Sequence, residues 1–349
     1  MNDQPEQRED KPSRRYFLFW RILLCVLSVP LTGWAGMAIF YSNLPGAFLR
    51  VSMAATVVLF AVSVFFWSFS LKRAIAFYGI GFAVVLVWWW LIPASNDRQW
   101  QTDVAVLSYA DISGDTLTIH NIRNYDYTTP KDYTPAYYDK TIDLCKLQTA
   151  DLFLIYWGSK LIAHTILSFG FEDGSYIAIS IETRKEQGEE YSAIKGFFKQ
   201  FELTYVVADE RDVIRLRTNY RKEDVYLYRL RTDPVIMREV FLDYFKQINR
   251  LIDQAQWYNA LTHNCTTTIR GHAKPYTPKQ TFDWRLLANG LIDQMAYERG
   301  TISNALPFDE LKKRSYINDI AQDLDDALDF SQKIRDQVLP EDRETVQIR

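Results

Sequence analysis

Three long runs of apolar residues lie within the first hundred residues of the chain. They extend over residues 22–40, 51–71 and 74–94, and none contains a charged side chain. Each has about the twenty residues that a helix needs to cross roughly 30 Å of hydrocarbon. The stretches 57–67 and 84–90 are apolar on every face, so a water-exposed helical hairpin is not favoured. The pattern predicts a membrane domain of three transmembrane helices over residues 17–94.

A cleaved signal peptide is the alternative interpretation of the first run. The run is long, lacks a clear small-residue cleavage site and is followed by two more runs. We therefore expect it to be a retained anchor.

Basic residues are distributed unevenly around the runs, and loops rich in Lys and Arg tend to stay in the cytoplasm. The basic residues on the predicted cytoplasmic side are Arg8, Lys11, Arg14, Arg15, Arg21, Lys72 and Arg73. The other two connections offer only Arg50 and Arg98. This asymmetry predicts a cytoplasmic tail over residues 1–16 and a domain outside the cytoplasm over residues 95–349. The prediction inverts if one run does not cross.

Short alternating segments separated by turn residues replace the long runs after residue 100. A strand at 161–171 and another at 176–184 flank Glu172-Asp173-Gly174-Ser175, a strong signal for an antiparallel hairpin. Further strands are predicted at 116–122, 205–208, 213–216 and 225–230, with 151–157 either a strand or a short helix. Helical spacing predicts helices at 235–256, 283–297 and 318–337, and a further helix that begins near Cys265. The outer segment is thus expected to be one α+β domain with an antiparallel sheet.

Composition and charge narrow the possible partners. The formal net charge is −3 and no block of Lys and Arg occurs, so we predict no nucleic-acid partner. Cys25 lies in the first apolar run, which leaves Cys145 and Cys265 in the outer domain. These two cysteines either pair in an oxidising compartment or leave one working thiol.

Cys265 is the candidate nucleophile. It follows Asn264, a favoured N-cap residue, and a cysteine at a helix N-terminus beside an imidazole has a lowered pKa. His164, on the first strand of the predicted hairpin, is the candidate base, although a histidine in a strand is also compatible with a purely structural role. Glu182 is the candidate third residue. A three-residue turn places it on the same face as His164, whereas a two-residue turn does not.

The remaining polar candidates are weaker. Arg184 and Arg217 are candidate substrate-binding residues, because a guanidinium binds phosphate or carboxylate, but surface charges on strands look the same in sequence. Asn264 is the third candidate substrate-binding residue. His263 and His272 flank Cys265 without a second cysteine or carboxylate at ligand spacing, so no metal and no cofactor are predicted.

Several motifs of the outer domain resemble those of the DUF4105 family, the Lnb-type periplasmic domain. They are Ile122-Arg123-Asn124-Tyr125, His164-Thr165-Ile166-Leu167-Ser168-Phe169-Gly170-Phe171, Ser180-Ile181-Glu182-Thr183-Arg184, Leu216-Arg217-Thr218-Asn219-Tyr220-Arg221, Tyr258-Asn259-Ala260-Leu261-Thr262-His263-Asn264-Cys265-Thr266-Thr267 and Pro307-Phe308.

The resemblance implies a lipoprotein N-acyltransferase with a circularly permuted papain-like fold of the NlpC/P60 kind, in which His164 and Cys265 carry over as the catalytic pair. Together with the three predicted helices, it implies a multi-pass protein of the bacterial inner membrane with a periplasmic domain, and phospholipid and lipoprotein as partners. Two alternatives stay open: a cysteine peptidase or amidase that acts on cell-wall peptide, and a non-catalytic membrane module that binds lipid or a partner.

Overall fold

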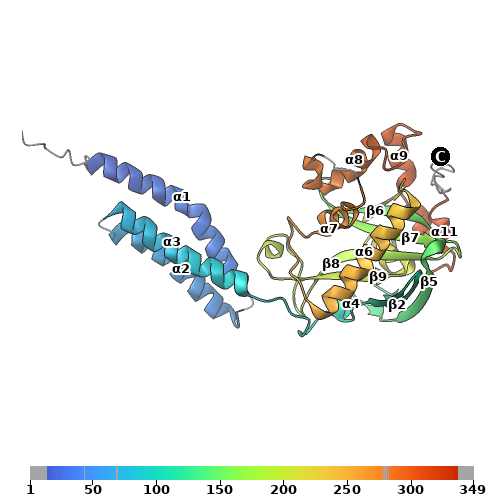
Figure 1. Ribbon diagram of the computed structural model, residues 1–349, viewed down its shortest axis with the longest axis horizontal. Helices are drawn as coiled ribbons and strands as arrows, with labels where there is room; N and C mark the ends of the chain where they lie inside the picture. The colour runs from blue at the N-terminus through green and yellow to red at the C-terminus, as the bar shows by residue number, and fades with distance from the viewer. Residues whose placement is uncertain (1–13, 43, 68–69, 278–280, 282, 337–349) are drawn as a thin grey trace, which may run out of the picture. The chain divides into compact units, whose positions relative to one another are not determined.

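The computed structural model describes residues 14–42, 44–67, 70–277, 281 and 283–336 (Figure 1). The chain divides into two compact units, one of residues 1–93 with 198–200 and the other of residues 94–197 with 201–349. Most of the predicted cytoplasmic tail (residues 1–13) and the last residue of the predicted helix 318–337 lie outside the described residues.

The first unit contains the three long apolar helices that the sequence predicts. They are α1 (Arg14–Phe40), α2 (Ala47–Trp67) and α3 (Leu71–Leu91), and each is long and apolar enough to cross a membrane. Where α1 meets α3, the hydroxyl of Tyr78 donates to the carbonyl of Ser28 at 3.1 Å and lies 3.1 Å from Thr32 Oγ1. Such polar contacts between helices are a common stabilising device in lipid, where apolar surface alone supplies no driving force.

The second unit is built on a mixed, mostly antiparallel sheet. Its strands in the described residues are β1 (Tyr109–Ser113), β2 (Thr116–Arg123), β5 (Tyr137–Asp143), β6 (Leu147–Tyr156), β7 (Ala163–Phe171), β8 (Tyr176–Arg184), β9 (Glu202–Ala208) and β10 (Asp224–Arg229). The order is β1-β2-β9-β8-β7-β6-β10, with β5 also paired to β2. The pairing of β2 with β9 is parallel and the others are antiparallel. A small separate sheet joins β3 (Asp126–Tyr127) and β4 (Tyr133–Thr134).

Helices cover both faces of the large sheet. On one face lie α6 (Pro234–Asp253), α7 (Cys265–Ala273) and α8 (Ile292–Glu298), whose apolar side chains share a core with Leu167 and Phe169 of β7. On the other face lie α5 (Glu210–Arg215), α10 (Asn318–Leu324) and α11 (Phe330–Lys333), which share a second core with Ile166. Because side chains alternate along a strand, β7 contributes to both cores. Figure 1 shows α6 crossing the strands, with α7 beside it.

The remaining elements are short. They are α4 (Thr102–Ala105), η1 (Leu144–Lys146), η2 (Lys195–Phe197), the π-helix η3 (Leu216–Tyr220), η4 (Trp284–Leu286), η5 (Asn289–Leu291) and α9 (Phe308–Ser315).

Three of the predicted elements differ from the structure. Residues 213–216, predicted as a strand, lie in α5 and η3, because Asp209 caps the helix by accepting a hydrogen bond from the Arg211 N–H. The predicted helix 283–297 is divided into η4, η5 and α8. The predicted helix 318–337 is divided into α10 and α11, with Asp325 at a φ of 45° after the first of them. The ambiguous segment 151–157 belongs to strand β6 up to Tyr156.

Candidate active site

The hairpin of β7 and β8 places His164 and Glu182 on one face of the sheet. Its turn has three residues, since the Phe171 N–H donates to the Ser175 carbonyl at 2.9 Å and Gly174 adopts a φ of 78°. The strands pair with Ile166 opposite Ser180. The same register brings Glu182 opposite His164, which is the arrangement that the three-residue turn requires.

Three side chains of this hairpin form a hydrogen-bonded chain. His164 Nε2 lies 2.7 Å from Ser180 Oγ and 3.1 Å from Glu182 Oε1. Ser180 Oγ donates to Glu182 Oε1 at 2.7 Å, so it accepts from His164 Nε2. Because Nε2 is engaged on this side, a hydrogen bond to the thiol would use Nδ1. Ser180 was not among the predicted catalytic residues, although period-two alternation places it on the face of Glu182.

Cys265 is the first residue of α7. Asn264 caps the helix: its side chain accepts from the Thr267 N–H at 2.9 Å, and Thr267 Oγ1 accepts from the Asn264 N–H at 3.0 Å. The capping residue predicted from sequence is therefore correct. This reciprocal cap leaves the N–H groups of Cys265 and Thr266 without an intrahelical acceptor, as is usual for the first residues of a helix.

Electrostatic interactions favour the thiolate of Cys265 and the imidazolium of His164, which both line the same pocket. Burial raises the pKa of Cys265, but the His164 imidazolium and hydrogen bonds from Thr165 outweigh burial and lower this pKa to about 7. Burial opposes the charged form of His164, but Glu182 and Cys265 outweigh burial and raise the pKa of His164 to about 9. The pKa of Glu182 lies well below its usual value, because His164, Arg217 and Ser180 together outweigh the cost of burial.

Arg217 forms ion pairs with Glu182 and Glu223. Its Nη2 donates to Glu182 Oε1 at 3.0 Å and its Nη1 donates to Glu223 Oε2 at 3.2 Å. Both bonds start from η3, which begins at the last residue of the predicted strand 213–216. The carboxylate of Glu182 therefore has a cation on each side, which explains why it stays ionised in a largely buried position.

The dyad opens into a pocket of about 490 Å³. Cys265, His164 and Glu182 line it together with apolar and basic side chains. The basic residues of its lining are Arg123, Lys185, Arg217 and Arg221. Arg123 is held by Asp212 through bonds of 2.9 and 2.8 Å, and Arg217 by the two glutamates. Arg221 is less engaged, with Glu223 at 4.0 Å.

Asn289 ties the two catalytic elements together. Its side chain exchanges two hydrogen bonds with the backbone of Ala163, at 3.0 and 2.7 Å, and donates to Thr266 Oγ1 at 3.0 Å. Ala163 precedes His164 and Thr266 follows Cys265. Gly290 continues this contact, because a Cβ at that position would lie 2.3 Å from the Lys160 carbonyl. The Asn-Gly pair inside a predicted helix was the available signal, since both are poor helix formers.

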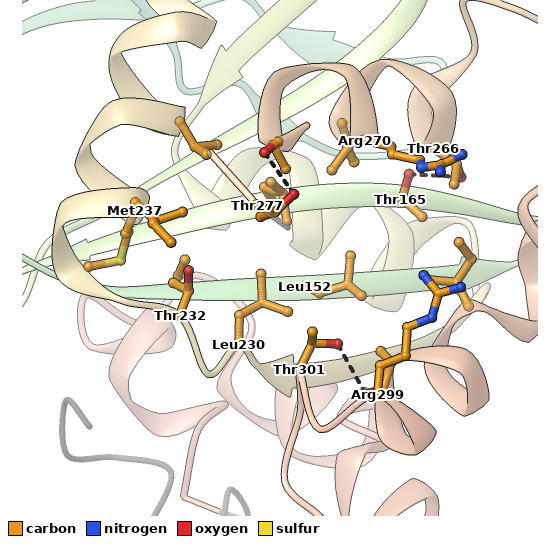
Figure 2. A pocket seen from close by; sticks show the side chains of 18 of the residues that line it. Leu152, Thr165, Leu230, Thr232, Met237, Thr266, Arg270, Thr277, Arg299 and Thr301 are labelled. Carbon is orange, nitrogen blue, oxygen red and sulfur yellow. Dashed lines mark hydrogen bonds between the residues drawn. The ribbon is translucent and has the colours of Figure 1, made fainter. Parts of the chain in front are cut away.

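A second, more apolar pocket of about 230 Å³ lies against β6, β7, α6, α7 and α8. Figure 2 shows Thr165 and Thr266 at one side of it and Met237 at the other. Thr266 Oγ1 lies 3.9 Å from Cys265 Sγ and 3.4 Å from Thr165 Oγ1. Thr165 and Thr266 thus belong to the lining of the apolar pocket, and Thr266 is also next to the thiol.

Other residues singled out from the sequence lie elsewhere or have other contacts. Arg184 is buried and donates to the carbonyls of Val104 and Ala105, and the lining of the dyad pocket does not include it among the described residues. His272 is bonded to Asp243 and Tyr205. The described residues contain no group of three or more His, Cys, Asp and Glu side chains positioned for a metal.

The three cysteines are all unbridged. Cys145 is exposed, with its Sγ 3.6 Å from Asp115 Oδ2, and nearby carboxylates raise its pKa, the carboxylate of Asp115 most of all. Cys265 and Cys145 therefore differ in the property that makes a thiol reactive, since the thiolate is the nucleophile.

Comparison with known proteins identifies the domain. Residues 133–290 match the family model of the Lnb N-terminal periplasmic domain. The second unit therefore carries an Lnb N-terminal periplasmic domain, and the chain combines it with three candidate transmembrane helices. The resemblance seen at 122–125 and 307–308 lies outside the matched segment. No curated protein and no solved structure matches the chain.

Proposed function

We propose that the protein is a membrane-anchored cysteine acyltransferase that moves an acyl chain from a phospholipid or lipoprotein ester to the N-terminal amine of a lipoprotein. The observation that carries this proposal is the placement of Cys265 at the N-terminus of α7 beside a His164 that is polarised by Ser180 and Glu182. The order of His164 before Cys265, on a strand and a helix respectively, supports a permuted papain-like arrangement.

The reaction has two stages. The Cys265 thiolate attacks the ester carbonyl, and the tetrahedral intermediate collapses as the C–O bond breaks and the leaving alkoxide takes the proton of the His164 imidazolium. A thioester results. The acceptor amine then attacks the thioester and gives a proton to His164, and the C–S bond breaks to form an amide and restore the thiolate. Covalent catalysis of this kind divides one difficult transfer into two easier steps.

The N-terminus of α7 supports the charge that develops on oxygen. The N–H groups of Cys265 and Thr266 are free of intrahelical acceptors, and the helix dipole favours negative charge at this end. Preorganised donors of this type contribute a large share of the rate acceleration in acyl transfer. We assign these two amides as the oxyanion donors.

The apolar pocket behind Thr165 and Thr266 favours an acyl substrate over a peptide. An engineered apolar cavity of about 150 Å³ holds benzene, so by that ratio 230 Å³ has room for roughly nine aliphatic carbons. Three of its threonine hydroxyls are already bonded to the protein: Thr266 to Asn289, Thr277 to the Ala273 carbonyl and Thr301 to the Ala296 carbonyl. Arg270 and Arg299 also line the pocket, but most of its other lining side chains are apolar, and an aliphatic chain suits these walls better than a polar peptide does.

We also propose that the N-terminus is cytoplasmic and that the Lnb domain is periplasmic in the bacterial inner membrane, as the distribution of basic residues favours. Protease added to intact spheroplasts should then digest the Lnb domain. Protection of the domain in spheroplasts and digestion only after lysis would overturn this orientation.

Intact mass spectrometry of the protein in phospholipid nanodiscs tests the chemistry. We expect an acyl adduct that hydroxylamine removes, present in the wild type and absent from Cys265→Ser. Addition of a diacylated lipopeptide should discharge the adduct and yield an N-acylated peptide. If no adduct forms while a cell-wall peptide is cleaved, the protein is a cysteine peptidase or amidase, with water in place of the amine.

A further inference from the structure

Large apolar side chains are exposed around the mouth of the dyad pocket. Trp157, Ile162, Tyr191, Leu261 and Leu287 line the pocket and are nevertheless 44 to 62% exposed. They come from separate connections: the β6–β7 loop, the segment between β8 and η2, the segment before α7, and the end of η4. Apolar side chains that converge from several loops on one opening are unusual for a surface that faces only water.

The same connections expose further apolar side chains within three residues of these along the chain. They are Leu161 on the β6–β7 loop, Ile194 just before η2, and Trp284 in η4. We name the eight residues the rim. Two tryptophans and a tyrosine belong to it, and these side chains are enriched at membrane–water interfaces because an apolar ring carries a polar edge.

The covalent connection to the membrane helices determines which apolar phase is near this surface. Helix α3 ends at Leu91 and the second unit begins at Ala94, so the covalent connection spans at most roughly 10 Å, at about 3.5 Å per residue. A connection this short keeps the domain close to the bilayer that holds α1, α2 and α3. The effective concentration of lipid at the rim is therefore high. Lipid is therefore the apolar phase continuously available to the rim.

We propose that the rim is a docking surface for the outer surface of the phospholipid bilayer, into which its apolar side chains insert. Insertion removes them from water, and each CH₂ group buried contributes to membrane binding. Docking would place the opening of the dyad pocket against lipid, so that an ester-linked acyl chain reaches the pocket without passing through water. The docking itself does not require that Cys265 be a nucleophile.

Site-specific fluorescence on the full chain tests the proposal. The background is Cys25→Ala, Cys145→Ala and Cys265→Ala, which removes all native thiols. Single cysteines are then introduced by Ile162→Cys or Leu287→Cys, labelled with a nitrobenzoxadiazole dye, and the protein is placed in nanodiscs of phosphatidylethanolamine and phosphatidylglycerol. The readouts are the emission maximum and quenching by lipids that carry a nitroxide on the acyl chain.

The matched control is Leu328→Cys. Leu328 is 89% exposed, lies between α10 and α11 and is not part of the pocket lining, so a dye there should emit as it does in water. We expect dyes at positions 162 and 287 to shift to shorter wavelength and to be quenched several-fold more than the dye at 328. Equal quenching at all three positions would overturn the proposal.

Two further outcomes separate the alternatives. A shift to shorter wavelength without quenching by lipid nitroxides would mean that protein, such as a second copy of the chain, covers the rim, and it would overturn docking to lipid. Because the background lacks Cys265, the result is independent of thioester formation. Quenching at the rim combined with no acyl adduct in the wild type would support docking and contradict the acyltransferase chemistry.

Discussion

Asn289 pairs with Ala163 as a neighbouring strand residue would, accepting from its N–H at 3.0 Å and donating to its carbonyl at 2.7 Å. A third bond, to Thr266 Oγ1, connects the same side chain to α7. Asn289 therefore fixes the spacing between the strand that carries His164 and the helix that carries Cys265. We regard it as a positioning residue rather than a catalytic one.

Asn289→Ala should lower kcat more than it raises KM. The substitution leaves two backbone groups of Ala163 without partners, and each unsatisfied buried group costs about 1–3 kcal/mol. We also expect the pKa that governs the acid limb of the pH profile to rise toward that of an ordinary thiol, as contact between Cys265 and His164 loosens. Loss of thermal stability with an unchanged pH profile and kcat would show that Asn289 is structural only.

Cys265→Ala and His164→Ala should each reduce acyl transfer by about 10⁴-fold or more, because residues that act as a unit lose their function together. Cys145→Ala should retain wild-type activity, since Cys145 is exposed and its pKa is raised. Turnover of a lipopeptide acceptor by the three purified variants provides the comparison. Loss of activity in the Cys145 variant alone would contradict the assignment of the nucleophile.

Glu182→Gln should lower kcat/KM by roughly 10²-fold, within the range for groups that support acid–base catalysis. The amide can still accept from Ser180 and Arg217, so the fold is retained while the negative charge beside His164 is lost. Glu223→Gln is the matched control, because Glu223 contacts Arg217, whereas the hydrogen bond and the ion pair described for His164 go to Ser180 and Glu182. Equal losses in the two variants would indicate that the whole ionic cluster, rather than the carboxylate of Glu182, matters.

The sequence predicted most of the fold, and the failures have physical causes. Alternation and turn residues located the β7–β8 hairpin, and the position of Asn264 located the start of α7, because these are local signals. The apolar residues of 213–216 predict a strand, but the cap Asp209 and the acidic residues after it favour the helix that forms. The bond from Asn289 to Ala163 joins segments more than a hundred residues apart, and the bond to Thr266 also joins separate elements. No local sequence pattern encodes such contacts.

Only part of the candidate site could be predicted, because some of its contacts depend on strand register and on distant segments. Whether Glu182 meets His164 depended on one residue in the turn length, and Gly174 at positive φ decides it in favour of the three-residue turn. The link from Arg217 to Glu182 requires the helical path of α5 and η3, and the strand predicted for 213–216 does not allow it.

Asp212→Ala should destabilise the Lnb domain by about 3–5 kcal/mol, the usual cost of removing one partner from a buried ion pair. The buried Asp212 carboxylate accepts from Arg123, from the Tyr125 N–H and from the Tyr127 hydroxyl, at 2.8 to 2.9 Å. Asp111→Ala is the control, because its contact with His120 is exposed and such pairs contribute about 0–1 kcal/mol. Thermal unfolding of the two variants should show a large fall in Tm for Asp212→Ala only.

The pH dependence of acyl-enzyme formation follows from the two catalytic groups. Attack requires the Cys265 thiolate, whose population is lost as pH falls through about 7, and protonation of the leaving group requires the His164 imidazolium, which is lost as pH rises through about 9. The profile of kcat/KM should therefore be a bell with limbs near these values, which belong to the coupled pair rather than to either residue alone. In Glu182→Gln the basic limb should move to lower pH and the acid limb to higher pH, because loss of the carboxylate destabilises the imidazolium and hence the thiolate beside it. A wild-type profile that rises through the ordinary thiol pKa without a basic limb would contradict the ion pair.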